Sequence, residues 1–318
     1  MRTHILATGS ALPARCVTNA DLAAQGVDTT DAWVRERTGI AQRYVAANGE
    51  TTATLATRAA QAALARAGLT AADLDLVIVA TSTPDYSFPS VGTQVQASLG
   101  MTRGAAFDVQ AVCSGFVYAL SVADSLLAAG HGTTAVVIGA ETFSKLLDWN
   151  DRTTCVLFGD GAGAVVVRRQ AGERGLLDTK LYSDGRHLDL LRASGGVATT
   201  ATAGHVLMNG REVYKHAVRA MADMVTDQLS RHGYTVADLD WLVPHQANAR
   251  ILSATAEHAK LPAEKVIVTI DLHANTSAAS IPLALDVAAA DGRLKPGQLV
   301  LLEAFGAGFT WASALLRW

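Results

Sequence analysis

The chain repeats one junction between a helix and a strand, and this repeat restricts the possible folds more than any other feature. The segment GLTAADLDLVIV starts at Gly68, and the similar segment GYTVADLDWLVP starts at Gly233. A helical stretch precedes each of them, at 52–67 and at 211–232. Two chance helix–strand junctions are the alternative, but the shared D-L-D sequence favours an internal duplication of an α/β unit.

Short apolar, β-branched runs alternate with Ala-rich helical stretches along the rest of the chain. The start of the chain lacks the apolar run of a signal peptide. It is better interpreted as an opening strand that ends at Gly9 and Pro13. The other expected strands are 75–80, 105–109, 134–139, 164–168, 241–244, 266–270 and 298–302. The expected helices are 52–67, 90–99, 114–130, 211–232, 247–259 and 279–291. This alternation indicates βαβ units and a mainly parallel sheet that is buried on both faces.

Size and composition agree with two closely packed halves. The chain has 318 residues, of which 50% are hydrophobic but only 6% aromatic, and such a chain can bury one large core or two medium ones. We expect an N-terminal half at 1–170, which carries the nucleophile discussed below, and a C-terminal half at 171–318. The polar segment 168–178 joins them, and no low-complexity linker separates them.

Charge and cysteine content argue against several classes of protein. The net charge of −3 argues against a nucleic-acid partner that is bound through overall charge. The three cysteines have no CxxC or Cys/His finger spacing, so we expect neither a disulfide framework nor a metal site. No uncharged apolar stretch approaches the roughly 18 residues that a membrane helix needs. The sequence therefore predicts a cytoplasmic protein without a membrane partner.

Cys113 is the first candidate for chemistry. An expected strand ends near Val109 and a helix begins at about Ser114, which places the thiol at a helix N-terminus. Free backbone N–H groups and the positive end of the helix dipole favour the thiolate there. Taken alone, a small cysteine in an Ala-rich chain is more often a core residue, and this is how we interpret Cys16 and Cys155.

His245 and Asn275 follow apolar runs in the same manner. His245 comes after WLVP and before a helix, where α/β sheets often place working groups, although a lone histidine can be purely structural. Asn275 can equally be a cap or a turn residue. If one sheet edge holds all three side chains, a thiol can attack while two neutral donors bind a developing oxyanion. Together they predict acyl transfer.

Six separated segments resemble the signature blocks of the β-ketoacyl-ACP synthase III family, in order and over the whole chain. They are VDTTDAWVRERTGI, VCSGF, FGDGAGA, LVPHQAN, HANTSAAS and EAFGAGFTW. The resemblance implies an α/β, thiolase-like fold with duplicated βαβ-rich halves in αβαβα layers, usually as a homodimer. It also implies an acyltransferase that needs no cofactor, because acyl-CoA and malonyl-ACP are its substrates.

The resemblance gives the three candidates their roles. Cys113 would take an acyl group, expected to be acetyl, from acyl-CoA. His245 and Asn275 would then hold malonyl-ACP while it loses carbon dioxide, and the carbanion would attack the acyl-cysteine, as in initiation of fatty acid biosynthesis. Backbone N–H groups of Cys113 and Ala307 would hold the oxyanion. The family commonly has glycine at the second of these positions, and alanine keeps the donor but tolerates positive φ poorly.

The resemblance also implies a CoA site. Trp33 and Arg152 match the residues that sandwich the adenine, and both groups stack well on a purine. Arg37 matches a cation close to the nucleotide. The residues expected to line the pantetheine channel are Gly210, Tyr214 and Asn248, of which Tyr214 can equally be a packing residue. Phe88 matches an aromatic that, in the dimer, bounds the acyl pocket of the partner subunit.

The expected surface for acyl carrier protein carries fewer positive charges than is common in the family. Lys215 and Arg250 match basic docking positions, and the alternative is that they are ordinary solvated charges. Related sequences often carry lysine pairs where this chain has Glu257-His258. Because such docking depends on local charge, we expect it to be weaker or differently specific.

Four other classes of protein compete with this interpretation. Thiolases need a second cysteine in the C-terminal half, and none follows Cys155. Elongating ketosynthases use two histidines, whereas Asn275 fits the initiating class. A non-catalytic CoA-binding partner would be expected to lack the nucleophile. The remaining alternative is an acyltransferase or starter-condensing enzyme of secondary metabolism, which an intact Cys/His/Asn set disfavours but does not exclude.

Overall fold

The computed structural model describes residues 1–318 and contains two mixed β-sheets. The first sheet has the order β1-β7-β6-β4-β5, with β1 at Arg2–Ala11, β4 at Leu76–Ala80, β5 at Ala105–Val109, β6 at Thr134–Glu141 and β7 at Gly161–Gln170. The second has the order β11-β12-β13-β8, with β8 at Gly175–Ser183, β11 at Trp241–Pro244, β12 at Leu299–Gly306 and β13 at Thr310–Arg317. The first sheet thus uses strands from residues 2–170, and the second uses strands from residues 175–317.

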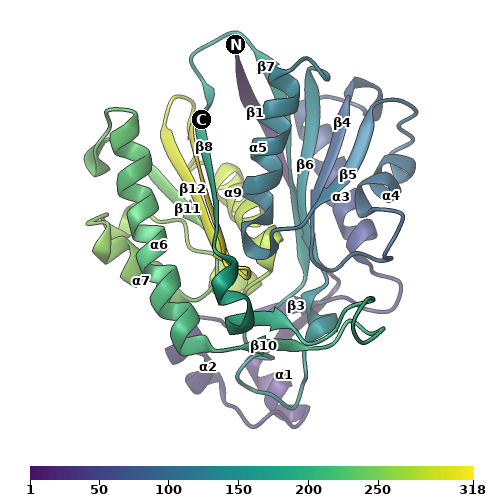
Figure 1. The fold of residues 1–318 in the computed structure, drawn as a ribbon, viewed down its shortest axis with the longest axis vertical. Coiled ribbons are helices and arrows are strands. Elements are labelled where there is room, and N and C mark those ends of the chain that lie inside the picture. The colour runs from purple at the N-terminus through teal and green to yellow at the C-terminus, as the bar shows by residue number, and fades with distance from the viewer.

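Helices cover both sheets and separate them. Helices α3 (Thr52–Ala67) and α4 (Val91–Ser98) pack on the outer face of the first sheet. Helices α5 (Gly115–Ala128) and α9 (Ser280–Ala290) lie between the sheets, and α6 (Gly210–Arg231) and α7 (Ala249–His258) cover the second sheet. Figure 1 shows this five-layer arrangement, with α5 and α9 in the middle. It is the αβαβα order that the resemblance implied.

Smaller elements gather at the lower end of the two sheets in Figure 1. They are β2 (Arg15–Thr18), α1 (Asn19–Ala24), α2 (Asp31–Thr38), β3 (Gln42–Val45), β9 (Leu191–Ala193), β10 (Val206–Met208) and α8 (Ile270–His273). The short 3₁₀ helices are η1 (Ala71–Asp73), η2 (Val112–Ser114), η3 (Phe143–Leu146), η4 (Gly185–Leu190), η5 (Val236–Asp238), η6 (Ala263–Lys265) and η7 (Ser277–Ala279). None of the helices combines the length and the apolar character needed to cross a membrane.

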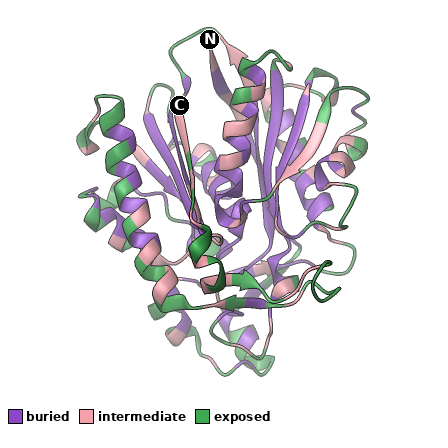
Figure 2. Cartoon of the chain, viewed as in Figure 1, coloured by how far each residue is buried: buried purple, intermediate pink, exposed green.

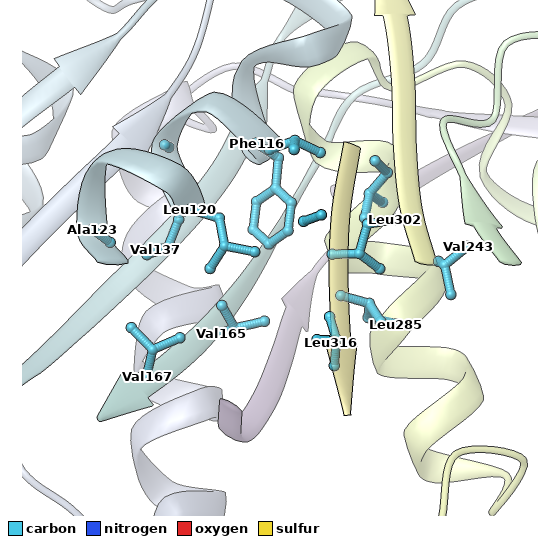
Figure 3. Packing of buried hydrophobic residues seen from close by; sticks show 14 of the residues in the cluster. Phe116, Leu120, Ala123, Val137, Val165, Val167, Val243, Leu285, Leu302 and Leu316 are labelled. Carbon is cyan, nitrogen blue, oxygen red and sulfur yellow. The ribbon is translucent and has the colours of Figure 1, made fainter. Parts of the chain in front are cut away.

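The largest hydrophobic cluster fills the space between the sheets. It joins Phe116 and Leu120 of α5 to Val137 of the first sheet and Leu302 of the second, as Figure 3 shows. Figure 2 shows that the central strands β4, β6 and β12 and the middle helix α9 are almost entirely buried, whereas the edge strands β5 and β8 and the outer helices are partly exposed. Small residues allow the layers to approach, because a Cβ added at Gly163 would lie 2.6 Å from a backbone nitrogen of α9.

The repeated sequence forms the same structure twice. In the first copy, Thr70 and Asp73 form a capping box on η1, and the side chain of Asp75 accepts hydrogen bonds from the backbone N–H groups that open β6. In the second copy, Thr235 and Asp238 cap η5, and the side chain of Asp240 accepts from Leu299 N–H at the start of β12. The second aspartate of each D-L-D sequence therefore ties its strand to the neighbouring strand.

The expected helices are found within a few residues of their expected bounds, but the mainly parallel sheet is wrong. Strand β7 runs antiparallel to both β1 and β6, and β13 runs antiparallel to both β12 and β8. No crossover helix leads into β7 or β13, so the chain is free to enter the sheet in the reverse direction. The expected strand at 266–270 is also wrong, since the segment makes one isolated bridge at Val266 before α8 begins.

Candidate active site

Cys113, His245 and Asn275 line one cavity of about 540 Å³. Cys113 comes from η2, which follows β5, and His245 follows the last residue of β11. Asn275 lies in the turn between α8 and η7. The backbone of Ala307, after β12, completes this wall. The structure therefore brings together the three side chains that the sequence predicted, although they come from distant parts of the chain.

The backbone around Cys113 has a tightly fixed shape. Val112 has a φ of 47°, a left-handed backbone conformation that residues other than glycine rarely adopt. This conformation turns the chain sharply from β5 into η2. Gly306 lies against the nucleophile, because a Cβ added there would be 2.8 Å from the Cβ of Cys113. The hydroxyl oxygen of Thr310 lies 3.1 Å from the carbonyl of Ala111 and 3.0 Å from that of Ala307, so its one proton is shared between them and links the two loops.

Ala307 does not have a positive φ, whereas its neighbour Gly308 has a φ of 132°. The alanine at this position is therefore compatible with the local backbone. The positive φ is needed at the next residue, Gly308, and glycine adopts it without strain.

The expected acidity of Cys113 is wrong for this structure. Burial, with a smaller contribution from the Glu141 carboxylate, raises the pKa of the thiol to about 12, although the Ser277 side chain lowers it. The helix N-terminus favours the thiolate, but removal from water opposes the charge more strongly. The raised pKa keeps Cys113 a neutral thiol at physiological pH.

His245 is held as a neutral imidazole. Its backbone N–H donates to the carbonyl of Glu303 at 2.8 Å, and its Nδ1 lies 2.6 Å from the hydroxyl of Ser280. Burial lowers the pKa of the ring to about 3. When the Ser280 hydroxyl donates to Nδ1, the proton of the imidazole is on Nε2, and the ring can donate from that atom without carrying charge.

Asn275 is fixed from three sides. Its backbone N–H donates to Leu157 and its carbonyl accepts from Gly159, both at 3.0 Å. Its side-chain Oδ1 accepts from the N–H of Ser277 at 2.9 Å, so the amide group is turned with its NH₂ as the remaining donor. The expectation that a strand precedes Asn275 is wrong, because α8 and Ala274, with a φ of 59°, precede it.

The expected adenine-binding residues lie together near the cavity but do not line it. The guanidinium of Arg37 lies 4.8 Å from the centre of the Trp33 ring, and that of Arg152 lies 5.2 Å from it. Arg152 also donates to the backbone and side chain of Asp28, both at 2.8 Å. The side chain of Asn248, which lines the cavity, donates to the carbonyl of Arg37 and connects the two regions.

The remaining predicted residues are distributed around this site. Gly210 and Tyr214 line the cavity, as expected for a channel. Phe88 is 86% exposed and does not line the cavity of its own chain. Lys215 forms an ion pair with Glu212 at 2.7 Å, and Arg250 donates to the carbonyl of Glu36 at 3.3 Å. Both cations belong to helices that line the cavity, α6 and α7, and each already binds another group of the same chain.

Known proteins resemble this chain over its full length. Residues 107–185 match the family model described as 3-oxoacyl-[acyl-carrier-protein (ACP)] synthase III, and residues 229–318 match its C-terminal counterpart. A β-ketoacyl-[acyl-carrier-protein] synthase III from Rhizorhabdus wittichii is 60% identical over 318 residues, which cover 100% of this chain and 99% of the relative. The chain belongs to the β-ketoacyl-ACP synthase III family.

Solved structures confirm the thiolase-like fold. The crystal structure of the 3-oxoacyl-ACP synthase III from Aquifex aeolicus has a TM-score of 0.95 and 46% identity, covering 99% of this chain and 100% of that one. The priming β-ketosynthase of the R1128 polyketide pathway has a TM-score of 0.93 but 33% identity, covering 99% and 96%. As a β-ketoacyl-ACP synthase III, the chain is an acyltransferase of the initiating condensation in fatty acid biosynthesis.

Sequence reasoning missed several residues at this synthase III site. The hairpin of β9 and β10 contributes apolar walls through Leu191, Val206 and Met208, and no periodic pattern distinguishes these short strands. Ser277 and Glu141 both shift the pKa of the Cys113 thiol. Ser277 is two residues beyond Asn275 in the HANTSAAS block, but Glu141 follows an apolar strand without any motif of its own.

Proposed function

We propose that the enzyme loads an acetyl group from acetyl-CoA onto Cys113 and then condenses it with malonyl-ACP. The acyl-cysteine accepts the carbanion that forms when the malonyl group loses carbon dioxide, and the product is a β-ketoacyl-ACP. The observation that carries this proposal is the meeting of one thiol with two uncharged donor side chains in a single, largely apolar cavity.

In this proposal His245 and Asn275 stabilise the enolate of the decarboxylation step. The low pKa of His245 keeps the ring neutral at physiological pH, so that Nε2–H is a donor. Asn275 offers its NH₂, because Oδ1 is already bound by the Ser277 backbone. The hydrogen bonds from such preorganised donors become stronger as negative charge develops on the thioester oxygen. The backbone N–H groups of Cys113 and Ala307 would serve the acyl-transfer step.

The CoA nucleotide would bind outside the cavity, with its pantetheine arm passing Gly210, Tyr214 and Asn248. Adenine would stack between Trp33 and Arg152, with Arg37 near its phosphates. Since Arg152 already stacks on Trp33 and binds Asp28, its guanidinium must move outward to admit the base. This exchange costs little, because an exposed ion pair contributes roughly 0–1 kcal/mol.

We further propose a homodimer that receives acyl carrier protein at Lys215 and Arg250. Strand β5 is the edge strand of the first sheet, and the largely exposed Phe88 and Tyr86 lie in one loop nearby. Unpaired strand edges and exposed aromatics are typical of protein contacts. The requirement of Cys113 for a free thiol favours the reducing cytoplasm as its location.

The roles of His245 and Asn275 can be separated from loading. We expect His245→Ala and Asn275→Ala to retain acetylation of Cys113 while losing decarboxylation of malonyl-ACP by about 100-fold or more, as expected when an oxyanion donor is removed. Released carbon dioxide and intact-protein mass measure the two steps. Unchanged decarboxylation in both variants would refute the assigned roles.

A further inference from the structure

Two histidines meet at a wall of the active-site cavity and have no part in the proposed reaction. His187 lies in η4 and His216 lies in α6, and the centres of their rings are 4.4 Å apart. The centre of each ring is also 5.3 Å from that of Phe309. Phe309 is almost completely buried, so this histidine pair, His187 and His216, packs on an aromatic ring of the core.

The two elements that carry the histidine pair close the same side of the active-site cavity. Leu188, the residue after His187, lines the cavity from η4, and Ala217, the residue after His216, lines it from α6. Figure 1 shows η4 as the short coil that follows β8, next to the first half of α6. The packed rings therefore hold together two elements whose separation would open the cavity.

Helix η4 is anchored at its two ends, and its middle depends on side-chain packing. Before η4, the backbone N–H and carbonyl groups of Asp184 and Phe309 exchange two hydrogen bonds, both at 2.8 Å. At the other end, the carbonyl of Leu190 accepts from the N–H of Asn209 at 2.8 Å. Leu188, between these anchors, is 54% exposed. The segment between the two fixed ends is therefore the part of η4 that can move away from α6.

The charged groups beside the histidine pair come from the start of η4 and from α6, and each has a partner of opposite sign. The ion pairs are Asp184 with Arg186 at 2.6 Å, Glu212 with Lys215 at 2.7 Å, Arg219 with Asp223 at 3.9 Å and Asp227 with Arg231 at 3.8 Å. Burial raises the pKa of Tyr182 from β8, so this side chain is neutral. The surroundings of the pair therefore carry no net charge.

The histidine pair is the part of this region that changes its charge near neutral pH, because histidine normally titrates between pH 5 and 8. Hydrogen bonds from Arg186 lower the pKa of Asp184, and those from Lys215 lower the pKa of Glu212, so both carboxylates stay ionised there. The side chain of His187 is 30% exposed, and both rings line a second cavity of about 530 Å³. Protons from solvent can therefore reach the pair.

A proton on each ring places two positive charges against each other. The ring centres are 4.4 Å apart, and charges at this distance repel, most strongly where water is partly excluded. The carboxylate of Asp184 lies 3.6 Å from Nε2 of His187 and offsets one charge, but it is shared with Arg186. Neutral rings pack without this repulsion. The contact is thus stable while at least one ring is neutral, and it weakens as the pH falls.

We propose that the histidine pair is a pH-sensitive latch that holds η4 on α6 while a ring is neutral and releases it when both rings are protonated. Release moves the middle of η4 away from α6 and makes the cavity more accessible beside Leu188. The inference goes beyond the proposed function, because the latch depends on ring packing and charge and is independent of the acyl group and of the carrier protein.

Hydrogen–deuterium exchange of residues 185–191 in the wild-type protein tests the latch directly. Protection factors remove the intrinsic effect of pH on exchange. We expect those of 185–191 to fall at least about 10-fold between pH 8 and pH 5.5, because local opening becomes more favourable. Residues 52–67 of α3, on the outer face of the first sheet, should keep their protection. Equal protection of 185–191 at both pH values would overturn the proposal.

Substitutions of His216 separate charge from packing. His216→Phe keeps an aromatic ring beside His187 but cannot gain a charge, so 185–191 should remain protected at pH 5.5. His216→Gln is a second uncharged variant, with the same expected result, should the larger ring disturb the fold. His216→Lys carries a charge at both pH values, and its protection should already be low at pH 8. Loss of protection at pH 5.5 in the uncharged variants would overturn the assignment to the histidine pair.

Alkylation of Cys113 by iodoacetamide measures the effect on access to the cavity. The rate also depends on the thiol itself and on buried acids such as Glu141, whose pKa burial raises to about 7. Dividing the wild-type rate by the His216→Phe rate removes both effects. This ratio should rise at least about threefold from pH 8 to pH 5.5 as the open population grows. A constant ratio would show that the latch does not control access.

His131→Phe is the matched control. His131 is an exposed histidine in the turn after α5 and lines neither cavity. Its alkylation rate should follow that of the wild type at both pH values, and a pH-dependent difference would overturn the assignment to the histidine pair. None of these measurements uses acyl-CoA or malonyl-ACP. The latch can therefore fail while the proposed function holds, and the proposed function can fail while the latch holds.

Discussion

The active site depends on single residues in unusual backbone conformations. Val112, Ala274 and Ser277 all have positive φ values, and each lies within two residues of Cys113 or Asn275. Each such conformation costs about 1–3 kcal/mol and persists only where the surrounding structure imposes it. Because none of the three is glycine, the sequence carries no signal for these turns. The chain thus stores strain around its nucleophile and its amide donor.

Trp33 offers a direct test of the CoA site at the scale of one residue. We expect Trp33→Ala to weaken CoA binding by roughly 5- to 100-fold, since stacking of a base on an aromatic ring contributes about 1–3 kcal/mol. Alkylation of Cys113 by iodoacetamide should stay unchanged, because Trp33 does not line the cavity. Isothermal titration with CoA measures the affinity. An unchanged dissociation constant would place the adenine elsewhere.

The grouping of the three candidate residues in one cavity was predictable from the sequence, but the acidity of Cys113 was not. Cys113, His245 and Asn275 each follow an apolar run and precede a helical pattern, which the sequence shows directly. The raised pKa of Cys113 depends on complete burial and on Glu141, which is 28 positions away in the chain and belongs to another strand. Such a shift is a property of packing, so helix position alone predicted its direction wrongly.

At the scale of elements, close contact between layers positions the turns that line the cavity. Glycines in β6 and β7 remove the side chains that would otherwise separate the first sheet from η7 and α9. Gly139 faces η7, and Gly163 faces the start of α9. The turn that holds Asn275 and Ser277 is therefore supported by the backbone of the neighbouring sheet.

Gly139→Ala should destabilise the protein by about 1–3 kcal/mol, the usual cost of overpacking a core. The added methyl group must displace the Ala278 carbonyl and with it η7. Gly185→Ala is the matched control, because a Cβ there meets no atom within 4 Å and the residue does not have a positive φ. Thermal unfolding of both variants measures the effect. Equal melting temperatures would mean that β6 and η7 are not tightly packed.

The sequence predicted helices better than strand directions. Helix α3 matches its expected range of 52–67, because Thr51 caps its start and Gly68 ends it in the left-handed conformation. Strands β8 and β13 were missed, since no helical pattern separates them from their neighbours and their pairing is decided at long range. Antiparallel pairing depends on where the chain returns, and local periodicity carries no information about that.

At the scale of the whole molecule, two similar units meet around one reactive cavity. The repeated D-L-D aspartates, Asp75 and Asp240, tie equivalent strands in the two sheets. Cys113 follows a strand of the first sheet, whereas His245 and Asn275 come from the second half of the chain. The candidate site therefore takes its side chains from both parts of the chain. The division at residues 170 and 171 stays a prediction.

The proposed homodimer has a simple test in solution. We expect sedimentation at micromolar concentration to give twice the mass of the chain, because β5 and the loop with Phe88 present an open strand edge and exposed aromatic rings. Phe88→Ala should change the acyl-chain preference of loading, while alkylation of Cys113 stays the same. A monomer at this concentration would remove the proposed role of Phe88 in a partner's acyl pocket.

The most direct test of the central claim is the mass of the intact protein after incubation with acetyl-CoA and then with malonyl-ACP. The account predicts one acetyl group on Cys113 in the wild type, its loss when malonyl-ACP is added, and no acetylation of Cys113→Ala. Acetylation that persists on Cys113→Ala, or a wild-type label that malonyl-ACP does not remove, would contradict it.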